Sequence, residues 1–189
     1  IFLLISSLSY SQTPNYIPTD SLIGWWPFNA NALDEGVNGY NGTNYGAILT
    51  NDRFGNSNSA FNFSNLNSYI KLPNSTVAYK YTISCWLNIA NVYDTSTFVS
   101  TQNLNTGNYY MNQVSMGYLY SQYSIPSTPS FGSAYALINN YNVPNSTWHH
   151  VLITYDGMTI SQYLDGALLS SGSPGVAIEY GNMGDKYIG

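Results

Sequence analysis

The chain has 189 residues, of which four are Lys or Arg and nine are Asp or Glu, for a formal net charge of −5. Charged residues make up 7% and aromatic residues 16%, the reverse of a disordered composition. Four scattered cations cannot neutralise a run of phosphates, which excludes nucleic-acid binding and binding to an anionic membrane surface. The single cysteine, Cys85, allows no internal disulfide. The length fits one domain.

Residues 1–11 are expected to be the remnant of a signal peptide. The run from Ile1 to Leu8 is apolar, and small residues precede a cleavage position after Ser11. The basic region that begins a signal peptide is not present, so we expect a fragment at this end. A buried N-terminal strand is the alternative, and the run is too short for the ~20 residues of a membrane span. Residues 12–20 are predicted to be a Pro-containing linker and residues 21–189 one domain of a secreted protein.

Short strand-like runs follow in chain order, separated by turns rich in Asn, Gly, Ser and Pro. In residues 81–89, Ile83, Cys85 and Leu87 would share one face of a strand, with Trp86 on the opposite face. Asp165-Gly166 predicts a two-residue type I′ hairpin, and Asp156-Gly157 a second turn of the same sort. No window shows a helical period, so we predict an all-β sandwich or barrel. The expected strands are 22–28, 59–63, 68–72, 81–89, 98–101, 113–120, 148–155, 159–164 and 167–170, with a last one at 187–189.

Four segments together resemble the laminin G-like, concanavalin A-like jelly-roll domains of secreted bacterial proteins, especially those of the Bacteroidetes. They are residues 22–29, which read LIGWWPFN; the loop 31–43, which reads NALDEGVNGYNGT; the strand 81–86, which reads YTISCW; and residues 147–166, which read TWHHVLITYDGMTISQYLDG. The resemblance covers residues 21–189. It implies two antiparallel sheets packed face to face. It also implies a closing strand after Gly189, so we expect truncation at this end.

The loop 34–43 is the best candidate for a cation site. It offers a carboxylate, amide side chains and carbonyls near glycines, the oxygen ligands that Ca²⁺ prefers. The resemblance implies a structural calcium in this loop, with Asp34 and Asn38 as side-chain ligands. The alternative is that Asp34 and the Asn side chains only stabilise a loop of Asx turns. An EF-hand is excluded, because Gly36 stands at the third ligand position and Tyr45 replaces the bidentate Glu.

Catalytic chemistry finds little support in the sequence. Retaining glycosidases need two carboxylates ~5–5.5 Å apart, and no two acidic residues have the i, i+2 spacing that would place them so on one strand. His149 and His150 would point to opposite faces of a strand and so cannot chelate one ion together. Neither has a cysteine or acidic neighbour at ligand spacing, so we predict a structural role beside Trp148. Cys85 is interpreted as a small buried hydrophobe.

We therefore predict a non-catalytic extracellular binding or adhesion module that recognises carbohydrate or another cell-surface or matrix component, with a structural calcium. The stretch from Gln102 to Ser146 is rich in Tyr, Asn and Ser, which can stack on sugar rings and bond their hydroxyls. Tyr is also a favoured strand residue, so this face can equally be structural. The alternative function is an accessory domain of a secreted glycoside hydrolase or other hydrolase, whose catalytic part lies elsewhere in a larger chain.

Overall fold

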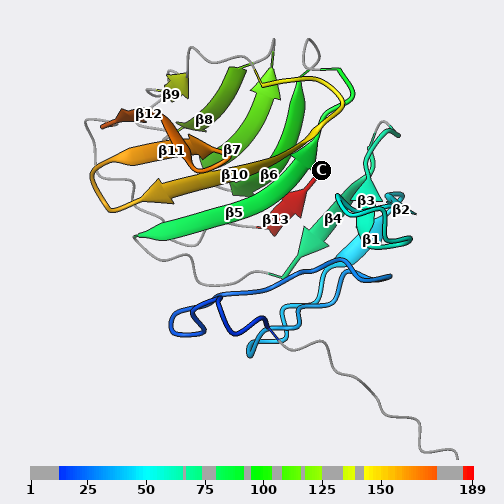
Figure 1. Ribbon diagram of the computed structural model, residues 1–189. Coiled ribbons are helices and arrows are strands. Elements are labelled where there is room, and N and C mark those ends of the chain that lie inside the picture. The colour runs from blue at the N-terminus through cyan, green and yellow to red at the C-terminus, as the bar shows by residue number, and fades with distance from the viewer. Residues whose placement is uncertain are drawn as a thin grey trace, which may run out of the picture.

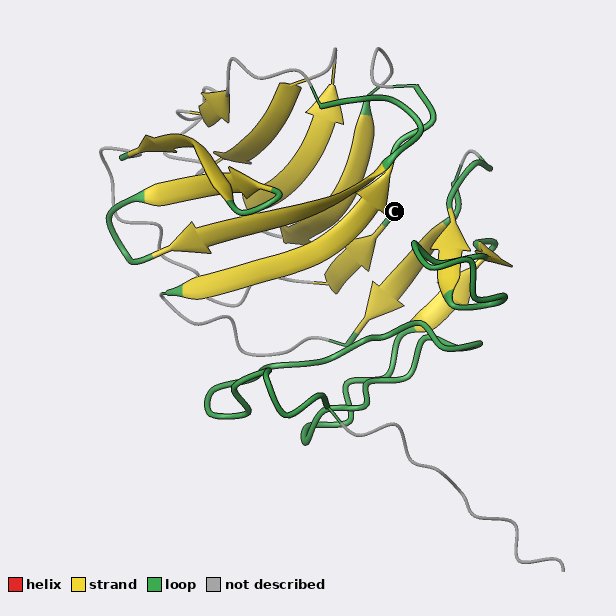
Figure 2. Cartoon of the chain, in the orientation of Figure 1, coloured by secondary structure: helices red, strands yellow, loops and turns green. Residues whose placement is uncertain are grey.

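The computed structural model describes residues 13–65, 67–73, 80–91, 95–103, 108–115, 118–124, 134–138, 143–173 and 185–189. Every regular element in these residues is a strand (Figure 2). The strand pairs are all antiparallel. The predicted all-β, antiparallel fold is therefore confirmed.

The strands form two large sheets and one short hairpin (Figure 1). The seven-stranded sheet has the order β1 (Thr43–Tyr45), β4 (Tyr69–Leu72), β13 (Asp185–Ile188), β6 (Ser96–Asn103), β7 (Asn108–Ser115), β8 (Tyr118–Ser124) and β9 (Ala134–Ile138). The four-stranded sheet has the order β12 (Ala167–Gly172), β11 (Ile160–Leu164), β10 (Trp148–Tyr155) and β5 (Tyr81–Asn88). The hairpin pairs β2 (Ile48–Thr50) with β3 (Ala60–Asn62).

The two large sheets pack face to face around one apolar core. Alternation along the strands builds it, because every second side chain points inward. β5 directs Ile83, Cys85 and Leu87 to the core and leaves Trp86 outside, as predicted. A buried hydrogen bond from Gln162 Nε2 on β11 to Ser121 Oγ on β8 also crosses between the sheets. The buried members of the core are Phe98, Leu119, Val143, Val151, Ile153, Tyr155, Ile160 and Leu164.

A second, smaller apolar cluster lies under β4. Ile70 and Leu72 point into it, and Trp26 and Phe28 from the N-terminal segment pack against it. The strand predicted at 22–28 is wrong: this segment is irregular, and Phe28 has a φ of 60°. Its apolar residues reflect packing against β4 rather than pairing in a sheet. The signal-peptide prediction for residues 1–11 lies outside the described residues.

The connections between strands confirm one prediction and correct two others. Asp165 and Gly166 alone join β11 to β12 with φ values of 49° and 84°, which confirms the type I′ hairpin. Asp156-Gly157 is instead part of a four-residue connection from β10 to β11, closed by a hydrogen bond from Asp156 N to Thr159 O. The single strand expected at 113–120 spans the end of β7 and the start of β8, which pair with each other.

Candidate functional site

The outer face of the four-stranded sheet carries the tryptophan side chain that is most open to solvent in the described part of the chain. Trp86 is 43% exposed. Its cross-strand partner on β10 is His150, and the two rings lie 5.3 Å apart, centroid to centroid. His150 Nε2 is 2.8 Å from Ser84 Oγ, on the same face of β5. An apolar ring is thus flanked by groups that can donate and accept hydrogen bonds.

The loop between β2 and β3 brings two more side chains to this face. The guanidinium Cζ of Arg53 lies 4.5 Å from the ring centroid of Trp86 and 4.2 Å from that of Phe54. Phe54 itself is 72% exposed. Contacts of this kind between a cation and an aromatic ring contribute about 0.5–1 kcal/mol at exposed sites. We call Arg53, Phe54, Ser84, Trp86 and His150 together the Trp86 platform.

The loop that carries Arg53 is held in shape by Asp52. Its Oδ1 accepts hydrogen bonds from the backbone N–H groups of Phe54 and Asn56, and its Oδ2 accepts one from Asn56 Nδ2. The Asn56 side chain is the largest cause that lowers the pKa of this carboxyl below 3.8. Asp52 therefore stays charged at neutral pH, and its hydrogen bonds stabilise this loop conformation.

His150 is held in its neutral form by its surroundings. Burial against the sheet lowers its pKa below 6.5 and exceeds the opposing effect of the Asp165 charge, while Arg53 lowers it further. At neutral pH one ring nitrogen is then a donor and the other an acceptor. The imidazole therefore adds hydrogen-bonding capacity beside Trp86 rather than positive charge.

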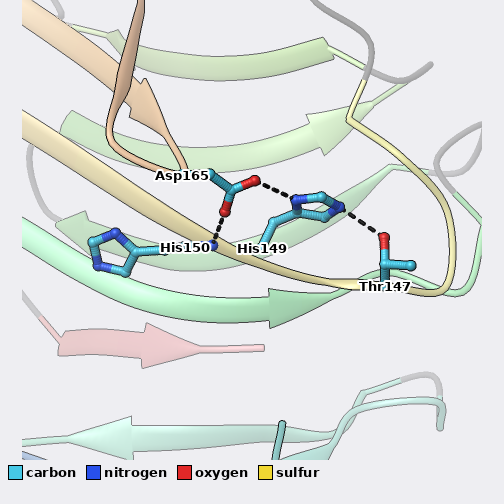
Figure 3. Close-up of polar contacts among 4 residues, drawn as sticks. All are labelled: Thr147, His149, His150 and Asp165. Carbon is cyan, nitrogen blue, oxygen red and sulfur yellow. Dashed lines mark hydrogen bonds and ion pairs between the residues drawn. The ribbon is translucent and has the colours of Figure 1, made fainter.

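His149 points to the opposite side of β10 and belongs to a separate network (Figure 3). Its Nδ1 lies 2.7 Å from Asp165 Oδ2, and its Nε2 lies 2.7 Å from Thr147 Oγ1. Asp165 Oδ1 accepts a hydrogen bond from the backbone N–H of His150. The sequence has no acidic residue at ligand spacing from either histidine, but the fold supplies one to His149, because the β11–β12 hairpin brings Asp165 to the start of β10. Both ring nitrogens are used within the fold, which supports the predicted structural role.

The predicted calcium ligands lie in the loop before β1. Asp34 is 8% exposed. Its Oδ1 accepts the backbone N–H groups of Trp25 and Gly36, and its Oδ2 accepts that of Tyr40, each at 2.8 Å. Asn38 is exposed and donates its Nδ2 to the carbonyls of Leu22 and Ile23. These bonds are of the kind that the alternative interpretation expects, in which Asp34 and Asn side chains stabilise the loop. No side-chain bond joins Asp34 to Asn38 among the described contacts.

Four other described carboxylates also have structural partners. Asp52 and Asp165 bond as described above, and Asp156 accepts the N–H groups of Met158 and Thr159. Asp185 pairs with Lys71 at 2.7 Å. Burial raises the pKa of the Cys85 thiol to about 12, which removes it as a nucleophile at neutral pH. Within the described residues, no group of three or more His, Cys, Asp or Glu side chains could hold a metal ion.

Sequence reasoning found part of this site. The period of β5 placed Trp86 on the outer face, but nothing in the sequence indicated that Arg53 and Phe54, more than 30 positions earlier, would lie against it. The Tyr-rich face proposed for 102–146 lies largely outside the residues whose side chains are described. In the described part of the chain, Tyr118 on β8 is 38% exposed. The described residues contain no helix with the length and apolar character needed to cross a membrane.

Solved structures that are similar to this chain include a mutant of HCR/D, a neurotoxin binding domain and an enzyme domain. A mutant of HCR/D is 18% identical with a TM-score of 0.62, over 90% of this chain and 44% of that one. The binding domain of botulinum neurotoxin serotype G is 16% identical with a TM-score of 0.56, over 82% and 40%. The laminarinase catalytic domain of Thermotoga maritima MSB8 is 12% identical with a TM-score of 0.45, over 75% and 62%, which is too distant for a functional argument.

The present chain thus spans less than half the length of the first two structures, and at these identities the likeness concerns the fold. No protein of curated function matches the sequence. A family model of laminin G type, described as the concanavalin A-like lectin/glucanases superfamily, matches residues 63–189, which is more than half of the chain. Together with the two-sheet antiparallel fold, this match shows that the chain belongs to the concanavalin A-like lectin/glucanases superfamily.

Proposed function

We propose that this chain is a non-catalytic, extracellular carbohydrate-binding module and that the Trp86 platform is its binding surface. The observation that carries the proposal is the 43% exposure of Trp86 on the outer face of the four-stranded sheet, in contact with His150 and Arg53. A sugar ring has an apolar face of C–H groups and an edge of hydroxyls. An aromatic ring with a polar rim suits both, because the ring receives the apolar face and the rim bonds the hydroxyls.

The partners of five of the seven described carboxylates, all except Asp20 and Glu35, support a non-catalytic role. An acid–base pair needs carboxyl groups that are free to exchange protons with the substrate. Asp34, Asp52, Asp156 and Asp165 accept backbone N–H groups, and Asp185 forms an ion pair. These five carboxylates therefore stabilise the fold rather than remain free to exchange protons with a substrate. The alternative assignment, an accessory domain beside a hydrolase in a larger secreted chain, would use the same platform to hold the polysaccharide.

A calcium ion at Asp34 and Asn38 stays a separate prediction. Asp34 Oδ2 accepts one hydrogen bond, against two at Oδ1, and so keeps capacity for a further partner. The adjacent Glu35 has a buried Oε2 with no hydrogen-bond partner among the described residues. These two oxygens support the prediction, but Ca²⁺ takes six to eight oxygen ligands. The sugar-binding proposal does not depend on the ion.

The experiment is a screen for glycan binding with Trp86→Ala and a matched control, Tyr118→Ala. Both variants remove an exposed aromatic ring, the first from the four-stranded sheet and the second from the seven-stranded sheet. Loss of a Trp that anchors an interface costs about 2 kcal/mol or more, so we expect the Kd to rise roughly 30-fold for Trp86→Ala. Tyr118→Ala is expected to bind as the parent chain does. Loss of binding in Tyr118→Ala alone would move the site to the other sheet.

A further inference from the structure

We infer that the Trp86 platform selects an anionic sugar unit, with the Arg53 guanidinium pairing with its carboxylate or sulfate group. This inference rests on the carbohydrate-binding function proposed above and names its ligand class. It is carried by three observations: the position of Arg53 over two rings, the commitment of the nearest carboxylate to other bonds, and the isolation of Arg53 from the other cations.

The Arg53 guanidinium is oriented before any ligand arrives. Its Cζ lies 4.2 Å from the ring centroid of Phe54 and 4.5 Å from that of Trp86. A guanidinium that stacks on aromatic faces keeps its N–H donors at its edge, where they match the two oxygens of a carboxylate or sulfate. The guanidinium covers part of each ring, but Phe54 is 72% and Trp86 43% exposed, which leaves apolar area for the C–H face of a sugar. One ligand can therefore contact an aromatic ring and Arg53 together.

The acidic residue beside Arg53, Asp52, does not bond to the N–H donors of the Arg53 guanidinium. The Asp52 carboxylate accepts three hydrogen bonds within its own loop, from Phe54 N, Asn56 N and Asn56 Nδ2. The ion pairs within 4 Å in the described part of the chain are Lys71 with Asp185 and His149 with Asp165, so Arg53 belongs to neither. Because the Asp52 geometry fixes the loop, it also fixes where Arg53 presents its donors.

The other cations lie elsewhere, which limits the ligand to one anionic group at a time. Lys71 is paired with Asp185 on the seven-stranded sheet, and Lys186 lies on β13 of the same sheet. Lys80 directly precedes β5, at the end of the strand remote from Trp86. With a net charge of −5, the chain repels a dense polyanion. A saccharide with a single uronate or sulfate in the contact unit satisfies both constraints.

The test compares the affinity of the full chain for three oligosaccharides of equal length by calorimetry. One carries glucuronate units, the second is its carboxyl-reduced neutral counterpart, and the third is the neutral one with a single sulfate. Arg53→Gln removes the charge, and Arg53→Lys keeps the charge but removes the paired N–H donors of the guanidinium. Lys80→Gln removes another exposed cation and is the matched control. Arg53 lies on an exposed loop, and a thermal unfolding scan verifies that each variant is folded.

We expect an anionic sugar to bind roughly 10- to 100-fold more tightly than its neutral counterpart, as for one charge-assisted hydrogen-bonded pair. Arg53→Gln should remove this preference, Arg53→Lys should keep only part of it, and Lys80→Gln should keep it whole. Preference for the uronate or the sulfate identifies the anionic group. Equal affinity for neutral and anionic sugars, lost in Trp86→Ala but not in Arg53→Gln, overturns this inference and leaves the sugar-binding function standing. If none of the sugars binds, both proposals fall.

Discussion

Asp34 is expected to determine the stability of the whole N-terminal loop. Its carboxylate accepts three backbone hydrogen bonds, from Trp25, Gly36 and Tyr40, each 2.8 Å long, and the residue is 8% exposed. Asp34→Ala would leave these three donors without their acceptor. Trp25 is adjacent to Trp26, which packs against the cluster under β4, so loss of the bonds should loosen this packing as well.

The magnitude follows from the bonds that are lost. A hydrogen bond to a charged group contributes about 1.5–3 kcal/mol, so three would sum to more than ~4 kcal/mol if independent. The donors are only partly buried, so water replaces part of this loss. We therefore expect a decrease of about 3 kcal/mol in the free energy of unfolding. For a domain of this size that lowers Tm by roughly 6–12 °C. Asp34→Asn should lose about half as much, because its amide oxygen can still accept at the Oδ1 position.

The assay is thermal unfolding of the parent chain, Asp34→Ala, Asp34→Asn and the exposed control Asp20→Ala, in excess chelator and in calcium. The loss measured in chelator reports the hydrogen bonds alone. Any extra loss that appears only in calcium reports a bound ion, which at a hundredfold excess over Kd adds about 2.7 kcal/mol to the parent chain. If Asp34→Ala in chelator melts within 2 °C of the parent and the control, the reasoning about this loop is refuted.

Three further predictions concern the sheets. Asp165→Asn should be less stable than the parent chain near neutral pH and equally stable in acid. Burial raises the pKa of Asp165, but the His149 hydrogen bond, the His150 N–H and the charge of both histidines together lower it below 3.8. The contribution of Asp165 to stability is therefore present above pH ~4 and disappears as the pH falls through the folded pKa. Because the side chain is half exposed, we expect less than ~1 kcal/mol in urea titrations from pH 5 to 2, and a constant deficit would contradict this. Cys85 should react with a thiol reagent at least ~100-fold more slowly in the native chain than in urea. The reason is that a pKa raised from 9.0 to about 12 leaves far less thiolate. Equal rates in the two states would contradict the burial of the Cys85 thiol. Ile153→Ala, at a position 0% exposed between the sheets, should cost about 2–5 kcal/mol in chemical unfolding, whereas Leu168→Ala, 57% exposed, should stay within ~0.5 kcal/mol.

Local sequence predicted the parts of this protein that depend on near neighbours. The alternation in β5 and in β10 follows from the period of two along a strand, and it placed Ile83 inside and Trp86 outside. The Asp165-Gly166 turn follows from the positive φ that both positions require. The strand prediction for the apolar segment 22–28 is wrong because packing of a loop against an apolar cluster and packing in a strand favour the same residue types.

Contacts between distant segments could be decided only by the tertiary structure. Asp165 reaches His149 because the β11–β12 hairpin folds back beside β10, and Arg53 reaches Trp86 because the β2–β3 loop lies over the outer face of β5. Composition led to the prediction that the chain does not bind nucleic acids, and the strand pattern led to the fold class, which the structure confirms. Both predictions depend on sums over local properties. The candidate site is a juxtaposition of residues more than 30 positions apart, and its geometry depends on packing that no local pattern encodes.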